Sequence, residues 1–258
     1  MPNRLFVEIG LHGITFTVLT DSNAFTSVVA YNFNEQENIT DQLAAIFNST
    51  SLLEQNFTKK DIIWSFPEAL MVPYEYFNAS ATKETLELVY GDSGKKEIKT
   101  DLVYKHNFHT VYGVPVNLLN IVNNKMPYAN NSHLYSLLPD IAANNGTQLL
   151  VIFYQKQLIA TLVKEGKLQM IQAFAYKTGQ DAAYHLLNTC ERFEVSAGEI
   201  PLQLSGLIDE SSNLYNELHK YFLHIGFTNL PENFEYTAAL KEHPQHFFSY
   251  LFATAACV

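Results

Sequence analysis

Three short apolar runs near the N-terminus recur in the same order in the second half of the chain, 144 residues further on. The pairs are Leu5–Val7 with Leu149–Val151, Ile14–Leu19 with Leu158–Val163 and, after a slip of one residue, Val28–Phe33 with Ile171–Tyr176. Each run has the length of a strand, and the turns between them are short enough only for antiparallel neighbours. This recurrence predicts two copies of one structural unit.

A helix and a fourth strand are predicted to follow the three strands in each half. In the first half, apolar residues recur at helical spacing over Ile39–Phe47, and a strand is predicted over residues 61–66. In the second half, Thr178 and Asp181 have the spacing of a capping box at a helix start, and a strand is predicted over residues 199–204. Each half therefore reads β-β-β-α-β, with its last strand parallel to its first because a helical crossover favours that arrangement.

The pattern divides the chain into four predicted parts. These are a first half over residues 1–110, a helical connection over 111–145, a second half over 146–230 and a C-terminal segment over 231–258. In the connection, helices are expected over 116–122 and 134–143, with Asn130-Asn131-Ser132 as the break between them. The C-terminal segment carries an aromatic cluster over Phe247–Phe252 and is expected to be a helix that packs back on the body. A partner-binding amphipathic tail is the alternative.

Composition and charge narrow the functional classes. Hydrophobic residues make up 47% of the 258 positions, which is enough to form a core. The formal net charge of −10 argues against binding nucleic acid or an anionic membrane surface. No apolar stretch reaches the roughly 18 residues of a transmembrane helix, so membrane insertion is not expected. The absence of a signal-peptide pattern and the presence of only two cysteines favour the cytoplasm.

Other local motifs give little chemistry. The histidine pairs His106 with His109 and His243 with His246 lack a third ligand at a convincing spacing, so no metal site is predicted. The segment Gly91–Lys96 is similar to a phosphate-binding loop only superficially, because Glu97 stands where a serine or threonine is required, and a turn is expected there. No catalytic residue is assigned.

Two β-β-β-α-β halves in one chain of this length resemble the actin-like superfamily, which includes actin, sugar kinases and the ATPase domain of heat-shock chaperones. The chain is similar in particular to bacterial cell-division and pilus-assembly members, and to an uncharacterised bacterial family of this size with degenerate actin-like halves. The resemblance implies an α/β fold built from a duplicated RNase-H-like unit, with mixed sheets flanked by helices. It also implies a nucleotide cleft whose loops can be compared with this sequence.

The first phosphate loop of that superfamily reads Asp-x-Gly-Thr/Ser, between the first two strands. The acid holds hydrated Mg²⁺, the glycine permits close phosphate approach, and hydroxyls and amides bind phosphate oxygens. Here Glu8 keeps an acid that is one methylene longer, Gly10 is kept, and Leu11 replaces the hydroxyl. Gly10 and Gly13 also have a structural explanation, because a tight turn favours glycine. Glu8 is expected to face solvent or the cleft.

The other two loops depart further from the superfamily pattern. In the second phosphate loop, Ile152 stands at the position of a carboxylate and Tyr154 at that of a glycine. The adenosine loop, usually a pair of glycines, corresponds to Ser205-Gly206, and Gly206 could instead serve a turn after the strand. The remaining candidates for contact with a nucleotide are Glu8, Gly10, Gly13, Ser205 and Gly206.

The favoured interpretation is a non-catalytic actin-like scaffold or protein-interaction module, a pseudo-ATPase without a cofactor that binds a protein partner or a second copy. The alternative is a residual nucleotide-binding ATPase or small-molecule kinase that uses Glu8, Gly10 and Gly206 with Mg-ATP. A third possibility is a site for another small ligand, which would be a pocket lined by aromatic side chains without phosphate-binding amides.

Overall fold

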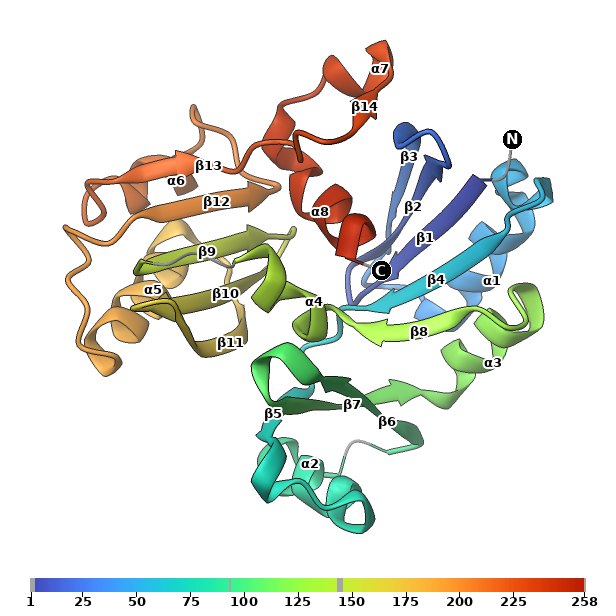
Figure 1. Ribbon diagram of the computed structural model, residues 1–258, viewed down its shortest axis with the longest axis horizontal. Coiled ribbons are helices and arrows are strands. Elements are labelled where there is room, and N and C mark those ends of the chain that lie inside the picture. The colour runs from blue at the N-terminus through green and yellow to red at the C-terminus, as the bar shows by residue number, and fades with distance from the viewer. Residues whose placement is uncertain (1–2, 93, 143–145, 258) are drawn as a thin grey trace. The chain divides into compact units, whose positions relative to one another are not determined.

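The computed structural model describes residues 3–92, 94–142 and 146–257 (Figure 1). The chain forms two compact units. Unit 1 extends to Leu137 and also includes Asn233–Leu240, whereas unit 2 consists of Leu138–Glu232 and Lys241–Cys257. The chain therefore passes from one unit to the other three times. Among the described residues, no helix is both long and apolar enough to span a membrane.

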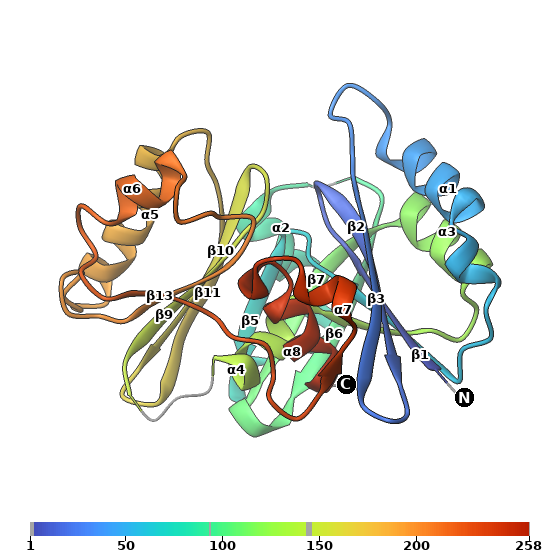
Figure 2. The same cartoon turned by 90° about the horizontal axis from the view of Figure 1, so that it is seen from above.

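Unit 1 is built on a six-stranded mixed sheet of order β14-β3-β2-β1-β4-β8. Its elements are β1 (Asn3–Ile9), β2 (Gly13–Thr20), β3 (Ala24–Asn32), α1 (Ile39–Ser49), β4 (Lys59–Trp64), α3 (Val116–Lys125), β8 (Asn130–His133), β14 (Glu235–Tyr236) and α7 (Ala238–Lys241). β1 pairs antiparallel with β2 and parallel with β4, as predicted. Helices α1 and α3 lie along one face of this sheet (Figure 2), where Phe47 packs edge-on against Phe16 at 5.9 Å.

Unit 2 repeats this arrangement in a five-stranded sheet of order β11-β10-β9-β12-β13. Its elements are β9 (Gln148–Phe153), β10 (Gln157–Lys164), β11 (Lys167–Ala175), α5 (Gly179–Arg192), β12 (Leu202–Gly206), α6 (Asn213–Leu218), β13 (Ile225–Phe227) and α8 (Ser249–Cys257). β9 pairs antiparallel with β10 and parallel with β12. β12 begins directly after Pro201 rather than at Glu199, where the pattern placed its start.

The predicted duplication is confirmed down to the turn hydrogen bonds. In unit 1, the amide of Gly10 donates to the carbonyl of Gly13 at 3.0 Å. In unit 2, the residues 144 positions later form the same bond, from the amide of Tyr154 to the carbonyl of Gln157 at 2.8 Å. β10 also starts 144 residues after β2, whereas β11 starts 143 residues after β3, which is the predicted slip of one residue. The capping box of α5 is present too, because Thr178 and Asp181 each accept the other's backbone amide.

A small antiparallel sheet of order β5-β7-β6 is inserted in unit 1 between β4 and α3. Its elements are β5 (Ala69–Pro73), α2 (Thr82–Tyr90), β6 (Lys96–Val103) and β7 (Phe108–Pro115). A turn is predicted just before β6. Gly91 and Gly94 both have positive φ, 77° and 74°, as a turn there requires, while Ser93 lies outside the described residues.

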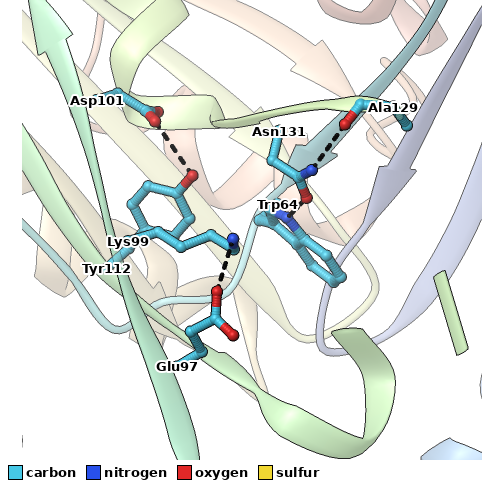
Figure 3. A network of polar contacts seen from close by, with 7 residues as sticks. All are labelled: Trp64, Glu97, Lys99, Asp101, Tyr112, Ala129 and Asn131. Carbon is cyan, nitrogen blue, oxygen red and sulfur yellow. Dashed lines mark hydrogen bonds and ion pairs between the residues drawn. The ribbon is translucent and has the colours of Figure 1, made fainter. Parts of the chain in front are cut away.

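The connection predicted to be helical over residues 111–145 also contains a strand. Asn130–Ser132, predicted to be a break, belongs to β8, which runs parallel to β4 before α4 (Leu134–Ile141) begins. Asn130 Nδ2 donates to Asp61 Oδ1 at 2.8 Å. Trp64 Nε1 donates to Asn131 Oδ1 at the same distance, as Figure 3 shows. Polar side chains thus hold a strand that no apolar pattern marks. Ala143, at the predicted helix end, lies outside the described residues.

A half-buried carboxylate, Asp101, connects the small sheet to the start of α4, and Figure 3 shows its contact with Tyr112. Asp101 on β6 accepts from the Tyr112 hydroxyl at 3.1 Å through Oδ1, and from the His133 amide and the Ser136 hydroxyl, both at 2.7 Å, through Oδ2. Burial raises the pKa of Asp101, an effect that these three hydrogen bonds oppose. The carboxylate therefore holds two elements together at the expense of its own hydration.

Two replacements of Asp101 should distinguish the loss of its hydrogen bonds from the effect of its protonation on stability. Asp101→Ala leaves three donors without an acceptor and is expected to lower the free energy of unfolding by about 2–3 kcal/mol. Asp101→Asn keeps the size and one acceptor oxygen and should lower it less. Because the pKa of Asp101 is raised in the folded state, its stabilising contribution is present at low pH and is lost as the pH rises through the folded-state pKa.

The stability of the wild type relative to Asp101→Asn should therefore fall as the pH is raised from about 4 to about 7. Urea unfolding of both proteins at the two pH values measures this difference. A difference that stays constant, or grows with pH, would contradict the assignment.

Candidate functional site

The first candidate acid is buried. Glu8 lies in the central strand β1, opposite Thr15 on β2 and Ile63 on β4, and only 5% of it is exposed. Of the two orientations expected for Glu8, the solvent-facing one is therefore wrong. The cleft-facing one stays a prediction. Leu11, at the tip of the following turn, is 47% exposed and offers no hydroxyl.

Close packing accounts for both glycines of this turn. A Cβ atom on Gly13 would overlap the carbonyl oxygen of Tyr31, and one on Gly10 would overlap Oγ of Ser65. Neither glycine has a positive φ, so the constraint is space rather than backbone conformation. Within unit 1, sheet packing alone is thus sufficient to require glycine at Gly13, where the overlapping atom belongs to the backbone, whereas at Gly10 it is the end of the Ser65 side chain.

The matching turn of unit 2 carries bulky side chains. Ile152 is fully buried in β9, and Tyr154 begins the turn into β10. The Tyr154 ring packs edge-on against Tyr250 of α8, with ring centroids 5.8 Å apart. Its carbonyl accepts from the Tyr176 hydroxyl at 2.8 Å, and burial raises the pKa of Tyr176 to about 12. The phenol of Tyr154 therefore occupies the position at which the resemblance requires bare backbone.

The candidate hydroxyl of the adenosine loop already has partners within unit 2. Ser205 is fully buried at the end of β12, and its Oγ lies 3.0 Å from the carbonyl of His246 and 2.9 Å from Oγ of Ser249. Ser249 Oγ in turn hydrogen-bonds to Thr228, and His246 Nε2 donates to the carbonyl of Ile208 at 2.7 Å. The last part of the C-terminal segment, residues 245–257, is thus fixed across this end of β12.

Gly206 follows Ser205 in a conformation that favours glycine. Its φ is 81°, and a Cβ atom there would overlap the carbonyl oxygen of Phe153, its partner on β9. The amide of the next residue, Leu207, donates to that same carbonyl at 2.7 Å. Gly206 is therefore required by its positive φ and by the close approach of β12 to β9.

The structure brings together some of the predicted residues and adds others. Ser205, Gly206 and Tyr154 lie on neighbouring strand ends of unit 2, whereas Glu8, Gly10 and Gly13 belong to unit 1. Sequence reasoning missed the partners of Ser205, His246 and Ser249, and the partner of Tyr154, Tyr250. One signal for them was present: the terminal helix has apolar or small residues on all sides, which is typical of a buried helix.

The histidine pairs serve packing. His109 stacks on Phe77 with ring centroids 3.6 Å apart, and His246 is engaged with a backbone carbonyl. Within the described ranges, no group of three or more His, Cys, Asp or Glu side chains is placed to hold a metal ion. Cys190 is buried on α5, and burial raises its pKa to about 11, which makes it a poor nucleophile.

Comparison with solved structures identifies the fold as that of actin-like ATPases. The chain is similar to a Bacteroides thetaiotaomicron protein with an actin-like ATPase fold and unknown function, with a TM-score of 0.80 and 17% identity over 88% of this chain and 90% of that chain. It is also similar to a chain of the PilM–PilN type IV pilus biogenesis complex, with a TM-score of 0.64 and 12% identity over 99% and 98% of the two chains. For the filament of AlfA from a B. subtilis plasmid, the TM-score is 0.50 and the identity 9%, over 99% of both chains.

Within this fold class, the chain belongs to the DUF3822 family of proteins of unknown function, which it matches over residues 2–225. No curated protein matches it. The family match ends before residues 245–257, the segment that packs on Ser205.

Gly206 offers a test of the strand contact. Gly206→Ala forces a side chain into a positive φ and against Phe153, and is expected to lower the free energy of unfolding by about 2–4 kcal/mol. Gly198 is a matched control, because its φ is not positive and its nearest neighbour would lie 3.9 Å from an added Cβ. Chemical denaturation of both alanine variants measures the difference. Equal stability of the two variants would show that β12 does not need glycine at this position.

Proposed function

We propose that this chain is a non-catalytic actin-like protein-interaction module, in which the protein's own side chains replace the nucleotide chemistry of the fold. The observation that carries the proposal is the burial of Ser205 under the C-terminal segment, with its hydroxyl committed to His246 and Ser249. A nucleotide at this position would have to displace that segment and break these hydrogen bonds. No set of phosphate-binding groups would compensate for the hydrogen bonds lost in this way.

The residues at the phosphate positions support the same proposal. Mg-ATP requires carboxylates for hydrated Mg²⁺ and bare backbone amides for phosphate. Ile152 offers a buried aliphatic side chain instead of the second carboxylate, and Tyr154 offers a ring packed on Tyr250. Gly13 is explained by sheet packing and needs no ligand. These residues do not fit Mg-ATP, and we derive no reaction step from it.

Protein assembly is supported by the neighbours of the fold and by the surface of the small sheet. PilM was solved in a complex with PilN, and AlfA as a filament. In this chain, an aromatic patch is formed by Tyr74, Phe77, Leu102 and His109. Tyr74 and Phe77 both stack on His109, and Leu102 lies opposite His109 on the neighbouring strand.

Exposure of this patch favours a protein partner. Leu102 is 52% exposed and Tyr74 57%, and Tyr104, two residues after Leu102 in the chain, is 86% exposed. Contiguous exposed apolar side chains are typical of interaction surfaces. We take a different protein as the occupant, because the better-matching of the two assemblies above contains two different proteins. The two free cysteines fit a reducing compartment, and we propose the cytoplasm.

The absence of nucleotide chemistry is tested by calorimetry. Titration with Mg-ATP or Mg-ADP up to about 1 mM should give no heat of binding, and no hydrolysis should exceed background. Tyr154→Gly should not restore turnover, because Ile152 and Leu11 remain. Micromolar binding that is lost in Glu8→Gln but kept in the control Asp21→Asn, an exposed turn residue, would overturn the proposal in favour of a residual ATPase or kinase.

The partner is tested by site-specific crosslinking in the native cell. A photo-crosslinking residue at position 104 should capture one protein, whereas the same residue at position 184, a 65% exposed tyrosine of unit 2, should not. The captured protein, once purified, should bind the wild type and Tyr184→Ser, and should bind Tyr74→Ser/Leu102→Ser at least about tenfold more weakly. Equal capture at both positions contradicts the surface. Self-association in sedimentation experiments that the double variant abolishes contradicts the choice of a different protein.

A further inference from the structure

Unit 2 contains a cavity of about 300 Å³ on the sheet face that carries Ser205. Its floor is formed by Leu150 and Gln203 from paired positions of β9 and β12. One wall is the α8 side that carries Ser249 and Ala253, and another is the segment after β13. All lining residues belong to unit 2, so the site is complete within one compact body.

The floor presents a carboxamide that is free to bind a ligand. Gln203 lies in the middle of β12, and in the described part of the chain its amide has no hydrogen-bond partner. The amide lies over Gly226 of β13, where an added Cβ would stand 3.1 Å from Nε2 and 3.3 Å from Oε1. A side chain at Gly226 would make the carboxamide shift by a few tenths of an ångström. Gly226 therefore leaves room for a polar group that the protein itself does not satisfy.

The chemistry of the lining defines the ligand class. None of the lining residues is charged, so neither an anion nor a cation would find a counter-charge there. The polar groups are carboxamides and hydroxyls beside apolar side chains such as Leu150, Ile141 and Ala253. A carboxamide offers an N–H donor and a C=O acceptor side by side. Its best complement is a molecule with the reverse pair, which forms two parallel hydrogen bonds.

We propose that this cavity binds a small neutral molecule that presents a lactam edge, an N–H beside a C=O, to the Gln203 carboxamide. The apolar body of the ligand lies over Leu150 and against Ala253, while Gln203 sets its orientation. This lactam edge is shared by pyrimidine-type bases and cyclic dipeptides. The volume is at the lower end of the usual range of roughly 300–1,000 Å³ for ligand sites, which favours a single-ring compound. The site is separate from the proposed interaction surface, which lies in unit 1.

The test uses uracil and the cyclic dipeptide of glycine as probes, with dimethyluracil, whose N–H groups are blocked, as the matched control. The side-chain amide signals of Gln203 are assigned in a heteronuclear NMR spectrum by their loss in Gln203→Met. Titration of the wild type with either probe at up to about 10 mM should shift these signals, because weak binding is expected for so small a ligand. Dimethyluracil should not shift them. A shift by uracil alone assigns the site to planar bases, and a shift by both probes assigns it to the lactam edge itself.

Two variants change different sides of the cavity, and a third variant outside it serves as the control. Gln203→Met removes the donor and the acceptor, and Ala253→Leu fills the cavity from α8, so each should weaken binding of the probe at least about tenfold in ligand-observed NMR. Gln169→Met makes the same change at an exposed glutamine of β11 and should bind as the wild type does. If Gln203→Met does not fold, Ala253→Leu alone decides. The proposal is overturned if neither probe shifts the Gln203 signals, if dimethyluracil shifts them equally, or if binding persists in the folded variants.

Discussion

The need to cover both faces of the unit 2 sheet determines much of this structure. The central strand β9 is buried at every position except its first, and its neighbour β10 at every position except its last. Strands with this pattern have to be shielded on both sides. Helices α5 and α6 cover one side, where Leu186 and Leu218 pack against Val151 and Leu204. The other side needs a second cover, and at the end of β12 the C-terminal segment supplies it.

This cover links the core of unit 2 to the proposed loss of nucleotide chemistry. In a nucleotide-binding member of the fold, the same strand ends have to stay open to a ligand. Here the hydroxyl of Ser205 and the ring of Tyr154 are both in contact with α8. A buried hydroxyl without a partner would be destabilising by about 1–3 kcal/mol, so the bonds to His246 and Ser249 are part of what allows α8 to pack there. The cavity beside Gln203 is the space that this cover leaves unfilled.

Most of the repeated elements could be predicted from the sequence, because their apolar runs keep one offset in both halves. The polar strand β8 could not, since Asn130 and Asn131 are held by hydrogen bonds to Asp61 and Trp64 that lie far away in sequence. The burial of Glu8 could not be predicted either, because an acid within an apolar run gives no sign that neighbouring strands bury it. At the candidate site, the departures of Leu11, Ile152 and Tyr154 from the phosphate-loop pattern could each be recognised from the sequence. The partners of Ser205 were not, because no local pattern connects residues more than 40 positions apart.

The threefold passage of the chain between the units has a consequence for any attempt to divide the protein. Residues 138–232 form a continuous stretch, yet unit 2 also needs Lys241–Cys257, which the chain reaches only after contributing β14 to unit 1. A fragment cut at residue 232 would therefore lose α8 and present Leu150, Ile152 and Ser205 to water. Such a fragment would be prone to aggregate, and unit 1 would at the same time lose an edge strand. The two compact units therefore have to be expressed together, because neither is made of one continuous stretch of chain.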